Sequence, residues 1–89
     1  MEEVINMDSQ ELIKKLRKET GMTQRAFAEY FKMPLRTYEQ WERGKRKIPG
    51  YLLRLMVYKL KTEQLVTGIT EEMADKAAAR TTEKVTERR

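Results

Sequence analysis

The sequence predicts an all-α fold, a compact bundle of four to five helices. Apolar residues recur at intervals of three and four along most of the chain, which is the spacing of one helix face. β-branched residues do not alternate with polar ones, so strands are not expected. With 89 residues, the chain suits one hydrophobic core rather than two.

The first predicted helix covers residues 9–20. Asp8 can cap its start, and Glu11 stands three residues later, where it completes a capping box. Leucine and isoleucine residues give the helix an apolar stripe, and Gly21 suits its C-terminal end.

Two short helices, 24–31 and 34–43, are predicted on either side of a turn of about three residues. Thr23 is a suitable N-cap for the first of them. Pro34 has a fixed φ and no amide hydrogen, so it suits the first turn of the second, and Gly44 suits the end of that helix. Such a pair is a helix-turn-helix, a motif that presents its second helix to the major groove of DNA.

A fourth helix is predicted from Pro49 as far as Leu65 or Val66. Thr70 can cap a fifth, whereas residues 80–89 are almost wholly polar and are expected to fray. The predicted organisation is a flexible acidic N-terminus (1–7), a helix-turn-helix domain (8–67) and a polar, helical C-terminal tail (68–89).

Charge is distributed unevenly along the chain. Residues 12–61 contain fourteen Lys or Arg against four Glu, a net charge of +10, while residues 1–11 carry −4 and residues 62–89 carry −1. This concentration indicates a polyanionic partner. Lysines that only solvate helix faces would give the same count, so their positions in the fold must decide between the two interpretations.

The composition argues against an enzyme, a metal site and a membrane span. Cysteine and histidine are absent, which removes disulfides, thiolate metal sites and the commonest general base. The one serine, Ser9, has no histidine to activate it. No segment reaches the roughly 18 apolar residues that read as a membrane span, and the acidic start is unlike a secretory leader. We therefore expect a soluble, cytoplasmic, non-enzymatic protein without cofactor or bound metal.

One face of the helix predicted at 34–43 carries side chains suited to base edges. At about 100° per residue, Arg36, Gln40 and Arg43 lie within one stripe, and Tyr38 and Trp41 lie opposite. Arginine matches guanine O6 and N7, and glutamine matches adenine N6 and N7. A solvated helix would show a similar stripe, so the pattern alone leaves an ordinary surface open.

The segment from Leu16 to Pro49, LRKETGMTQRAFAEYFKMPLRTYEQWERGKRKIP, resembles the helix-turn-helix of phage repressors, Cro proteins and the XRE group of regulators. The resemblance is strongest at Thr23-Gln24, at Ala28 and at the run Trp41-Glu42-Arg43-Gly44. It implies a lambda-repressor-like DNA-binding domain.

The resemblance also implies roles for individual residues. Gln24 falls where the family has a glutamine that binds a phosphate and steadies the first side chain of the recognition helix. Arg17 and Glu42 fall where many members have an internal ion pair between the first helix and the end of the recognition helix. The main base-reading positions fall on Leu35, Arg36 and Gln40.

Three residues depart from the family pattern. Lys32 replaces a glycine at the first turn position, where φ is often positive, so we expect strain or an altered turn. Leu35 replaces a glutamine and suits a thymine methyl instead of adenine. Tyr38 is larger than the usual aliphatic residue, and its hydroxyl needs a partner or an outlet to water.

Other cations are assigned by their positions around the recognition helix. Helix-turn-helix proteins hold the DNA backbone on both sides of the groove, and the N-terminus of the helix that bears Arg25 also favours an anion. The predicted phosphate-binding cations are Arg25, Arg43, Lys45, Arg46 and Lys47. The cations predicted to be solubilising surface are Lys14, Lys15, Lys18, Arg54, Lys59 and Lys61.

These observations favour a transcriptional repressor or autoregulator that binds double-stranded DNA as a homodimer on a palindrome. An alternative is an antitoxin-type protein that binds DNA through the helix-turn-helix and a toxin through residues 63–89. A third is a helical bundle that binds no nucleic acid.

The C-terminal segment leaves its own alternatives open. Ile69, Met73 and Ala77 recur every four residues, as a dimer seam, a partner-binding edge or a cover for the core would require. Because the predicted core stripes all precede Leu65, truncation after Leu65 is expected to leave a folded core. If Leu65, Val66, Ile69 and Met73 form a dimer seam, the truncated protein is also expected to be a monomer.

Overall fold

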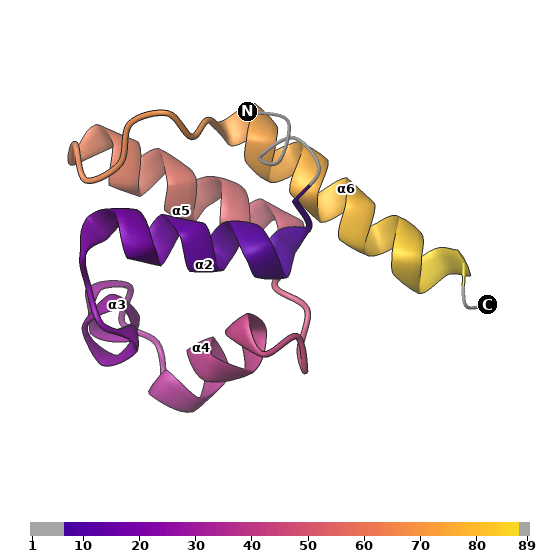
Figure 1. Cartoon of the computed structure of the whole chain (residues 1–89), viewed down its shortest axis with the longest axis horizontal. Coiled ribbons are helices and arrows are strands. Elements are labelled where there is room, and N and C mark those ends of the chain that lie inside the picture. Colours follow the sequence, from indigo (N-terminus) through magenta and orange to yellow (C-terminus); the bar gives the residue numbers. More distant parts are fainter. Residues whose placement is uncertain (1–6, 88–89) are drawn as a thin grey trace.

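The computed structural model describes the backbone of residues 7–87 and the side chains of residues 7–80. These residues form helices and no strand (Figure 1), which confirms the predicted all-α fold. The helices are α2 (Ser9–Thr20), α3 (Gln24–Tyr30), α4 (Leu35–Glu42), α5 (Gly50–Thr62) and α6 (Glu71–Glu87). None of the described helices is both long and apolar enough to cross a membrane. The predicted flexible N-terminus lies outside the described residues except for Met7.

The helix starts follow from the local side chains that the sequence places there. The Asp8 carboxylate accepts a hydrogen bond from the Glu11 amide at 3.0 Å, and the Glu11 side chain accepts from the Asp8 amide at 3.2 Å, which is the predicted capping box. The Thr23 hydroxyl accepts from the Ala26 amide at 3.1 Å and so caps α3. Each cap satisfies an amide that would otherwise lack a partner in the first turn.

The turn between α3 and α4 is built around Lys32 in a left-handed conformation, with φ of 57°. Its amide donates to the Glu29 carbonyl at 3.0 Å, and the Met33 amide donates to the Ala28 carbonyl at 3.0 Å. This pair of hydrogen bonds is a Schellman motif. Of the two outcomes expected for a non-glycine residue here, the structure shows the strained one.

Replacing Lys32 by glycine is expected to raise the free energy of unfolding by about 0.5–1 kcal/mol, because glycine adopts positive φ without a Cβ penalty. Urea denaturation followed by circular dichroism measures the change. Lys32→Ala is the matched control, because it removes the same charge but keeps a Cβ at φ of 57°. Equal stabilities for the two variants would show that the turn stores no strain.

The end of α5 differs from the prediction. The sequence indicated a helix as far as Leu65 or Val66, but α5 ends at Thr62. Gln64 is left-handed with φ of 64°, and the Leu65 amide turns back to the Leu60 carbonyl at 2.8 Å. The helix therefore closes in a second Schellman motif, in which glutamine occupies the position that usually holds glycine.

Helix α2 lies in the middle of the molecule, with α5 and α6 on one side of it and α3 and α4 on the other (Figure 1). Its buried Leu12, Ile13 and Leu16 contribute to a core that all five helices share. From α3 and α4 come the fully buried Phe27 and Tyr38, whose ring centroids are 5.1 Å apart. Apolar burial on both sides of α2 holds the helix-turn-helix against the rest of the chain.

The core continues past residue 67, the predicted end of the domain. Ile69, Ala74 and Ala77 are buried and belong to the same cluster as the leucines of α2. Of the three roles open for this stripe, the structure shows the cover for the core. Val66 is buried as well, so a dimer seam through Val66 and Ile69 is wrong. Helix α6 also continues to Glu87, although fraying was expected from residue 80.

Candidate nucleic-acid interface

Helix α4 has one buried face and one exposed face. Tyr38 and Trp41 are buried. On the other face, Arg36 and Arg43 are exposed and Gln40 is half-buried. The division follows the helical spacing of the sequence, so the stripe of polar side chains is free to meet a ligand.

The loop after α4 turns back onto the helix through a Schellman motif at Gly44, where φ is 76°. The Gly44 amide donates to the Trp41 carbonyl at 3.2 Å, and the Lys45 amide donates to the Gln40 carbonyl at 3.0 Å. The Arg46 amide reaches the same Gln40 carbonyl at 3.3 Å. These bonds hold the first two cations of the loop beside the polar face of α4.

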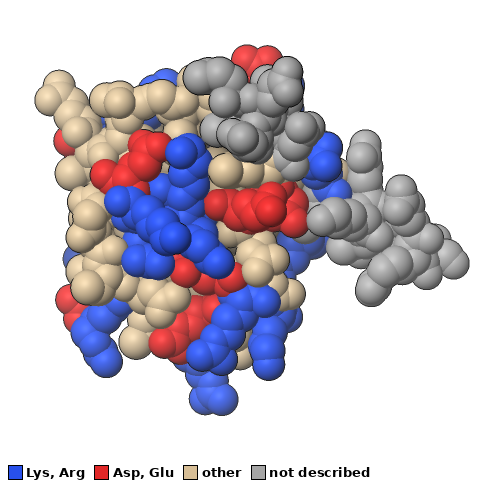
Figure 2. All heavy atoms as spheres, in the orientation of Figure 1, with Lys and Arg blue, Asp and Glu red and all other residues tan. Residues whose placement is uncertain are grey.

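As a result, α4 and the loop enclose a shallow depression of about 500 Å³. Its lining residues are Arg36, Thr37, Gln40, Lys45 and Arg46. Basic side chains project at the lower edge of Figure 2, where Figure 1 places α4. Thr37 is the lining residue that the sequence analysis missed. It lies three residues before Gln40 on the same flank of α4, so helical spacing was the signal that could have found it.

A side chain at position 44 would also press on the end of the flexible Gln10 side chain, which would have to shift. A Cβ added there would lie 2.7 Å from Oε1 of Gln10 on α2. The Gln10 Nε2 donates to the Glu42 carbonyl at 2.9 Å. Gln10 therefore ties the last turn of α4 to α2 and sets where the basic loop begins.

The cations divide into two groups by their partners. Within the described residues, Arg36 and the predicted phosphate-binding cations form no ion pair, nor do Lys14, Lys18 and Lys32. Four of the six cations assigned to ordinary surface are paired with acids, in the pairs Lys15–Glu19, Arg54–Asp75, Lys59–Glu63 and Lys61–Glu71. Most of these unpaired cations lie on α4 and in the loops on either side of it, where a polyanion site requires them, and two, Lys14 and Lys18, lie on α2.

The ion pair implied by the family resemblance is present, with Glu42 buried and Arg17 partly exposed. Arg17 Nε and Glu42 Oε2 are 2.7 Å apart, and a second bond joins Arg17 Nη2 to Glu42 Oε1 at 3.3 Å. Arg17 Nη1 also donates to the Met22 carbonyl at 3.1 Å. This bidentate pair joins α2 to the end of α4.

Two further side chains complete the site around Glu42. The Gln24 Nε2 donates to Glu42 Oε1 at 2.9 Å, and the Tyr38 hydroxyl donates to Glu42 Oε2. Tyr38 thereby finds the partner that its hydroxyl was expected to need, one helical turn along α4. The family resemblance implied two members of this cluster, Arg17 and Glu42, and the tertiary structure adds Gln24 and Tyr38.

Electrostatics in the cluster favour the charged pair. Burial alone would raise the pKa of Glu42, but hydrogen bonds from Arg17, Tyr38 and Gln24 hold that pKa below its usual range. The hydrogen bond to Glu42 raises the pKa of Arg17. Burial, followed by the bond to Glu42, raises the pKa of Tyr38. At neutral pH the carboxylate and the guanidinium therefore stay charged and the phenol stays protonated.

The remaining predicted site residues lie at the edges of the interface. Arg25, the second residue of α3, is exposed. The bond of Gln24 to Glu42 leaves one amide hydrogen of Gln24 for a phosphate. Leu35 is half-buried and packs against the core, so only part of its side chain faces outward.

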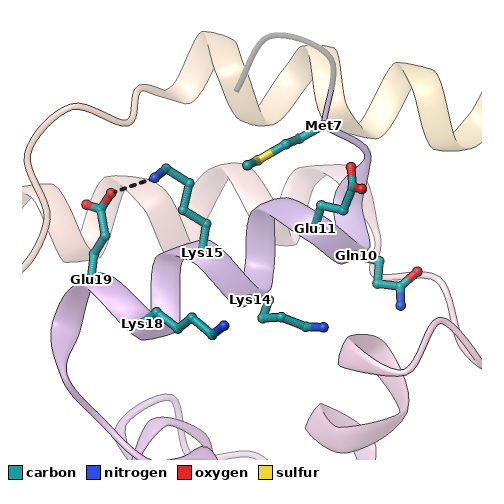
Figure 3. A pocket seen from close by; sticks show the side chains of 7 residues that line it. All are labelled: Met7, Gln10, Glu11, Lys14, Lys15, Lys18 and Glu19. Carbon is teal, nitrogen blue, oxygen red and sulfur yellow. Dashed lines mark ion pairs between the residues drawn. The ribbon is translucent and has the colours of Figure 1, made fainter. Parts of the chain in front are cut away.

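A second hollow, of about 410 Å³, runs along α2 (Figure 3). Figure 3 shows Lys14 and Lys18 pointing toward the Gln10 end of the helix, while Lys15 pairs with Glu19. The lining residues are Met7, Gln10, Glu11, Lys14, Lys15, Lys18 and Glu19. Two acids and three lysines line this hollow, so it suits a polyanion less well than the surface of α4. Within the described residues, no three acidic side chains gather as metal ligands.

Comparison with known proteins agrees with this geometry. The family model described as "Helix-turn-helix" matches residues 13–57, about half of the chain. Comparisons with curated proteins and with solved structures gave no match. The matched segment contains α3, the turn, α4, the basic loop and the cluster around Glu42.

Proposed function

Because the chain belongs to the XRE-type helix-turn-helix family of DNA-binding regulators, we propose that it is a repressor or autoregulator that binds a palindromic operator as a homodimer. The observation that carries the proposal is the surface of α4. A stripe of base-matching side chains lies beside a depression rimmed by unpaired cations.

In this proposal α4 enters the major groove with its polar face toward the bases. Arg36 bonds guanine O6 and N7, and Gln40 bonds adenine N6 and N7. The outward part of Leu35 contacts a thymine methyl. The exposure of Arg36 and the partial exposure of Gln40 and Leu35 support these roles.

Phosphate contacts flank the reading face. On one side the loop supplies its cations, held at a set distance from α4 by the two amide bonds to the Gln40 carbonyl. On the other side, the start of α3 supplies Gln24 and Arg25. The bond from Gln24 to Glu42 ties that start to the end of α4, so the two sets of contacts keep a constant spacing.

Arg36→Ala and Gln40→Ala are each expected to weaken binding to the preferred site by about 1–3 kcal/mol and to leave binding to random DNA almost unchanged. Selection from a random DNA pool identifies the preferred site, and fluorescence anisotropy then measures both affinities. Equal losses of binding free energy on preferred and random DNA would show that Arg36 and Gln40 do not read bases. A selected site without two-fold symmetry would contradict the palindrome.

Lys45→Ala and Lys47→Ala are expected to weaken binding to all DNA sequences alike and to reduce the slope of log K against log salt by about one for each phosphate that is no longer neutralised. Lys15→Ala is the matched control, because Lys15 is paired with Glu19 on α2. Salt slopes that stay at the wild-type value would show that Lys45 and Lys47 do not bind phosphate.

The antitoxin alternative draws no support from α6. Its buried Ala74 and Ala77 face the core of the same chain, and Met73 packs against that core. The described side chains that remain exposed on α6 are mainly charged, among them Glu72, Asp75 and Lys76. An apolar face for a second protein is therefore missing from the described part of this helix.

A further inference from the structure

Helix α5 carries an apolar stripe on its outer face. Tyr51 is 66% exposed, and Leu55 and Tyr58 are each 58% exposed. Their spacing of four and three residues puts them on one side of the helix, while Leu53, Met56, Val57 and Leu60 fill the core. Contiguous exposed apolar side chains of this size mark interaction sites on soluble proteins.

The three cations of α5 are each paired with an acid. On the α6 side, Arg54 pairs with Asp75, and Lys61 pairs with Glu71 at 3.0 Å. On the α3 side, Lys59 pairs with Glu63 at 3.1 Å and lies 4.9 Å from the centre of the Tyr30 ring. The stripe is therefore apolar at its centre and electrically balanced at its borders.

This balance identifies the kind of partner. The chain carries a net charge of +5, so two copies repel one another over most approaches. The α5 face presents matched charges of both signs and avoids that repulsion. The same balance makes it a poor surface for DNA or for an anionic membrane, both of which need excess positive charge.

We infer that the stripe of Tyr51, Leu55 and Tyr58 is the interface of the homodimer, with α5 packed antiparallel against α5 of a second copy. A two-fold axis presents the same patch from both copies. The middle of the stripe lies beside Leu55, so the axis passes near it and Leu55 meets its own counterpart. Tyr51 of one copy then lies against Tyr58 of the other. This inference deepens the proposed function, because it rests on the dimer proposed there.

The size of the stripe sets the strength of the dimer. Tyrosine covers apolar area at low entropic cost and is enriched in interfaces. One face of a 13-residue helix offers less than the roughly 800 Å² per partner of a standard interface. We therefore expect a weak, concentration-dependent dimer, strengthened on DNA because two half-sites raise the effective concentration.

The arrangement leaves the DNA-reading surface free. Helices α5 and α6 lie on the opposite side of α2 from α3 and α4 (Figure 1). A partner on the outer face of α5 therefore does not cover the depression beside Gln40. A dimer through α5 therefore leaves the α4 surface of each copy uncovered (Figure 1).

Sedimentation velocity over a range of concentrations tests the interface. The wild type should show a concentration-dependent dimer, and Leu55→Asp should stay monomeric with an unchanged circular dichroism spectrum. Thr67→Asp is the matched control, because it adds the same charge at an exposed residue outside α5 and should dimerise like the wild type. A monomeric wild type would assign the stripe to a different protein and overturn the inference. So would a Leu55→Asp variant that dimerises normally.

The absence of cysteine from the chain permits a second test that does not depend on weak association. Disulfides need Cα atoms about 4.4–6.8 Å apart, so Leu55→Cys should oxidise to a covalent dimer and Thr67→Cys should not. Tyr51→Cys mixed with Tyr58→Cys should cross-link faster than either variant alone. Faster self-linking of Tyr51→Cys would contradict the antiparallel arrangement.

DNA binding separates the failure of this inference from the failure of the proposed function. On a single half-site, Leu55→Asp should bind as the wild type does, and on the full palindrome it should lose the cooperative gain. A Leu55→Asp variant that keeps full cooperativity refutes the α5 interface and leaves DNA reading by α4 intact. A wild type without salt-sensitive DNA binding refutes the proposed function, while sedimentation and cross-linking still decide the interface.

Discussion

Replacement of Arg17 by alanine is expected to destabilise the fold by about 3–5 kcal/mol, because it leaves a buried carboxylate without its counter-charge. Glu42 is only 5% exposed, so water solvates its carboxylate poorly. Arg17 also donates to the Met22 carbonyl at 3.1 Å, and the substitution removes that bond as well. Urea denaturation at neutral pH, followed by tryptophan fluorescence, measures the effect on the free energy of unfolding.

The control for this substitution is a variant that removes both charges. Arg17→Met combined with Glu42→Met takes away the uncompensated charge and should recover part of the lost stability. Gln24 and Tyr38 would still lack their acceptor, so full recovery is not expected. A loss below about 1 kcal/mol for Arg17→Ala would mean that the pair acts as an ordinary surface salt bridge.

The same cluster predicts a dependence of stability on pH. The folded-state pKa of Glu42 is lowered, so its stabilising contribution is present above the unfolded value of about 4.3 and is lost as pH falls through the lower folded value. Glu42→Gln should lose less stability than the wild type when the pH is lowered through this window. Urea midpoints at several pH values make the comparison. Identical slopes for the two proteins would show that Glu42 does not contribute.

Truncation after Leu65 is expected to abolish cooperative folding, a larger effect than that of any single substitution. It removes Ile69, Ala74 and Ala77 and uncovers the apolar surfaces of α2 and α5 beneath them. Burial of one isoleucine side chain contributes about 1.5–3 kcal/mol. A domain of this size has only about 5–13 kcal/mol of stability in total. Circular dichroism and thermal denaturation should therefore show little native helix and no sharp transition.

Two milder variants show how much of the stability lost in this truncation comes from the buried residues after Leu65. Ile69→Ala should remain folded and lose about 2–5 kcal/mol, since it leaves a cavity under α6. Truncation after Arg80 keeps every side chain that the structure shows buried on α6 and should unfold cooperatively. A Leu65 truncation with wild-type helicity and melting temperature would restore the smaller domain of residues 8–67 that the sequence predicted.

The sequence by itself determined the features that depend on neighbours within about one helical turn. The Asp8 cap and the polar stripe through Arg36 and Gln40 rest on side chains within four residues of each other. Such features follow from local sterics and hydrogen bonding, which a sequence states directly. The family resemblance added Arg17 with Glu42, a pair that spacing alone did not join.

Only the tertiary structure decided what each apolar or polar face meets. Ile69 and Ala77 had the same spacing whether they covered the core or formed a seam, and the packing of α6 decided for the core. Leu55 is as apolar as its buried neighbours on α5, yet it is 58% exposed. Gln24 reaches Glu42 across the space between two helices. Periodicity identifies the apolar and polar faces of a helix. Which segment packs against each face depends on the positions of residues that are distant in the sequence, and local patterns do not specify those positions.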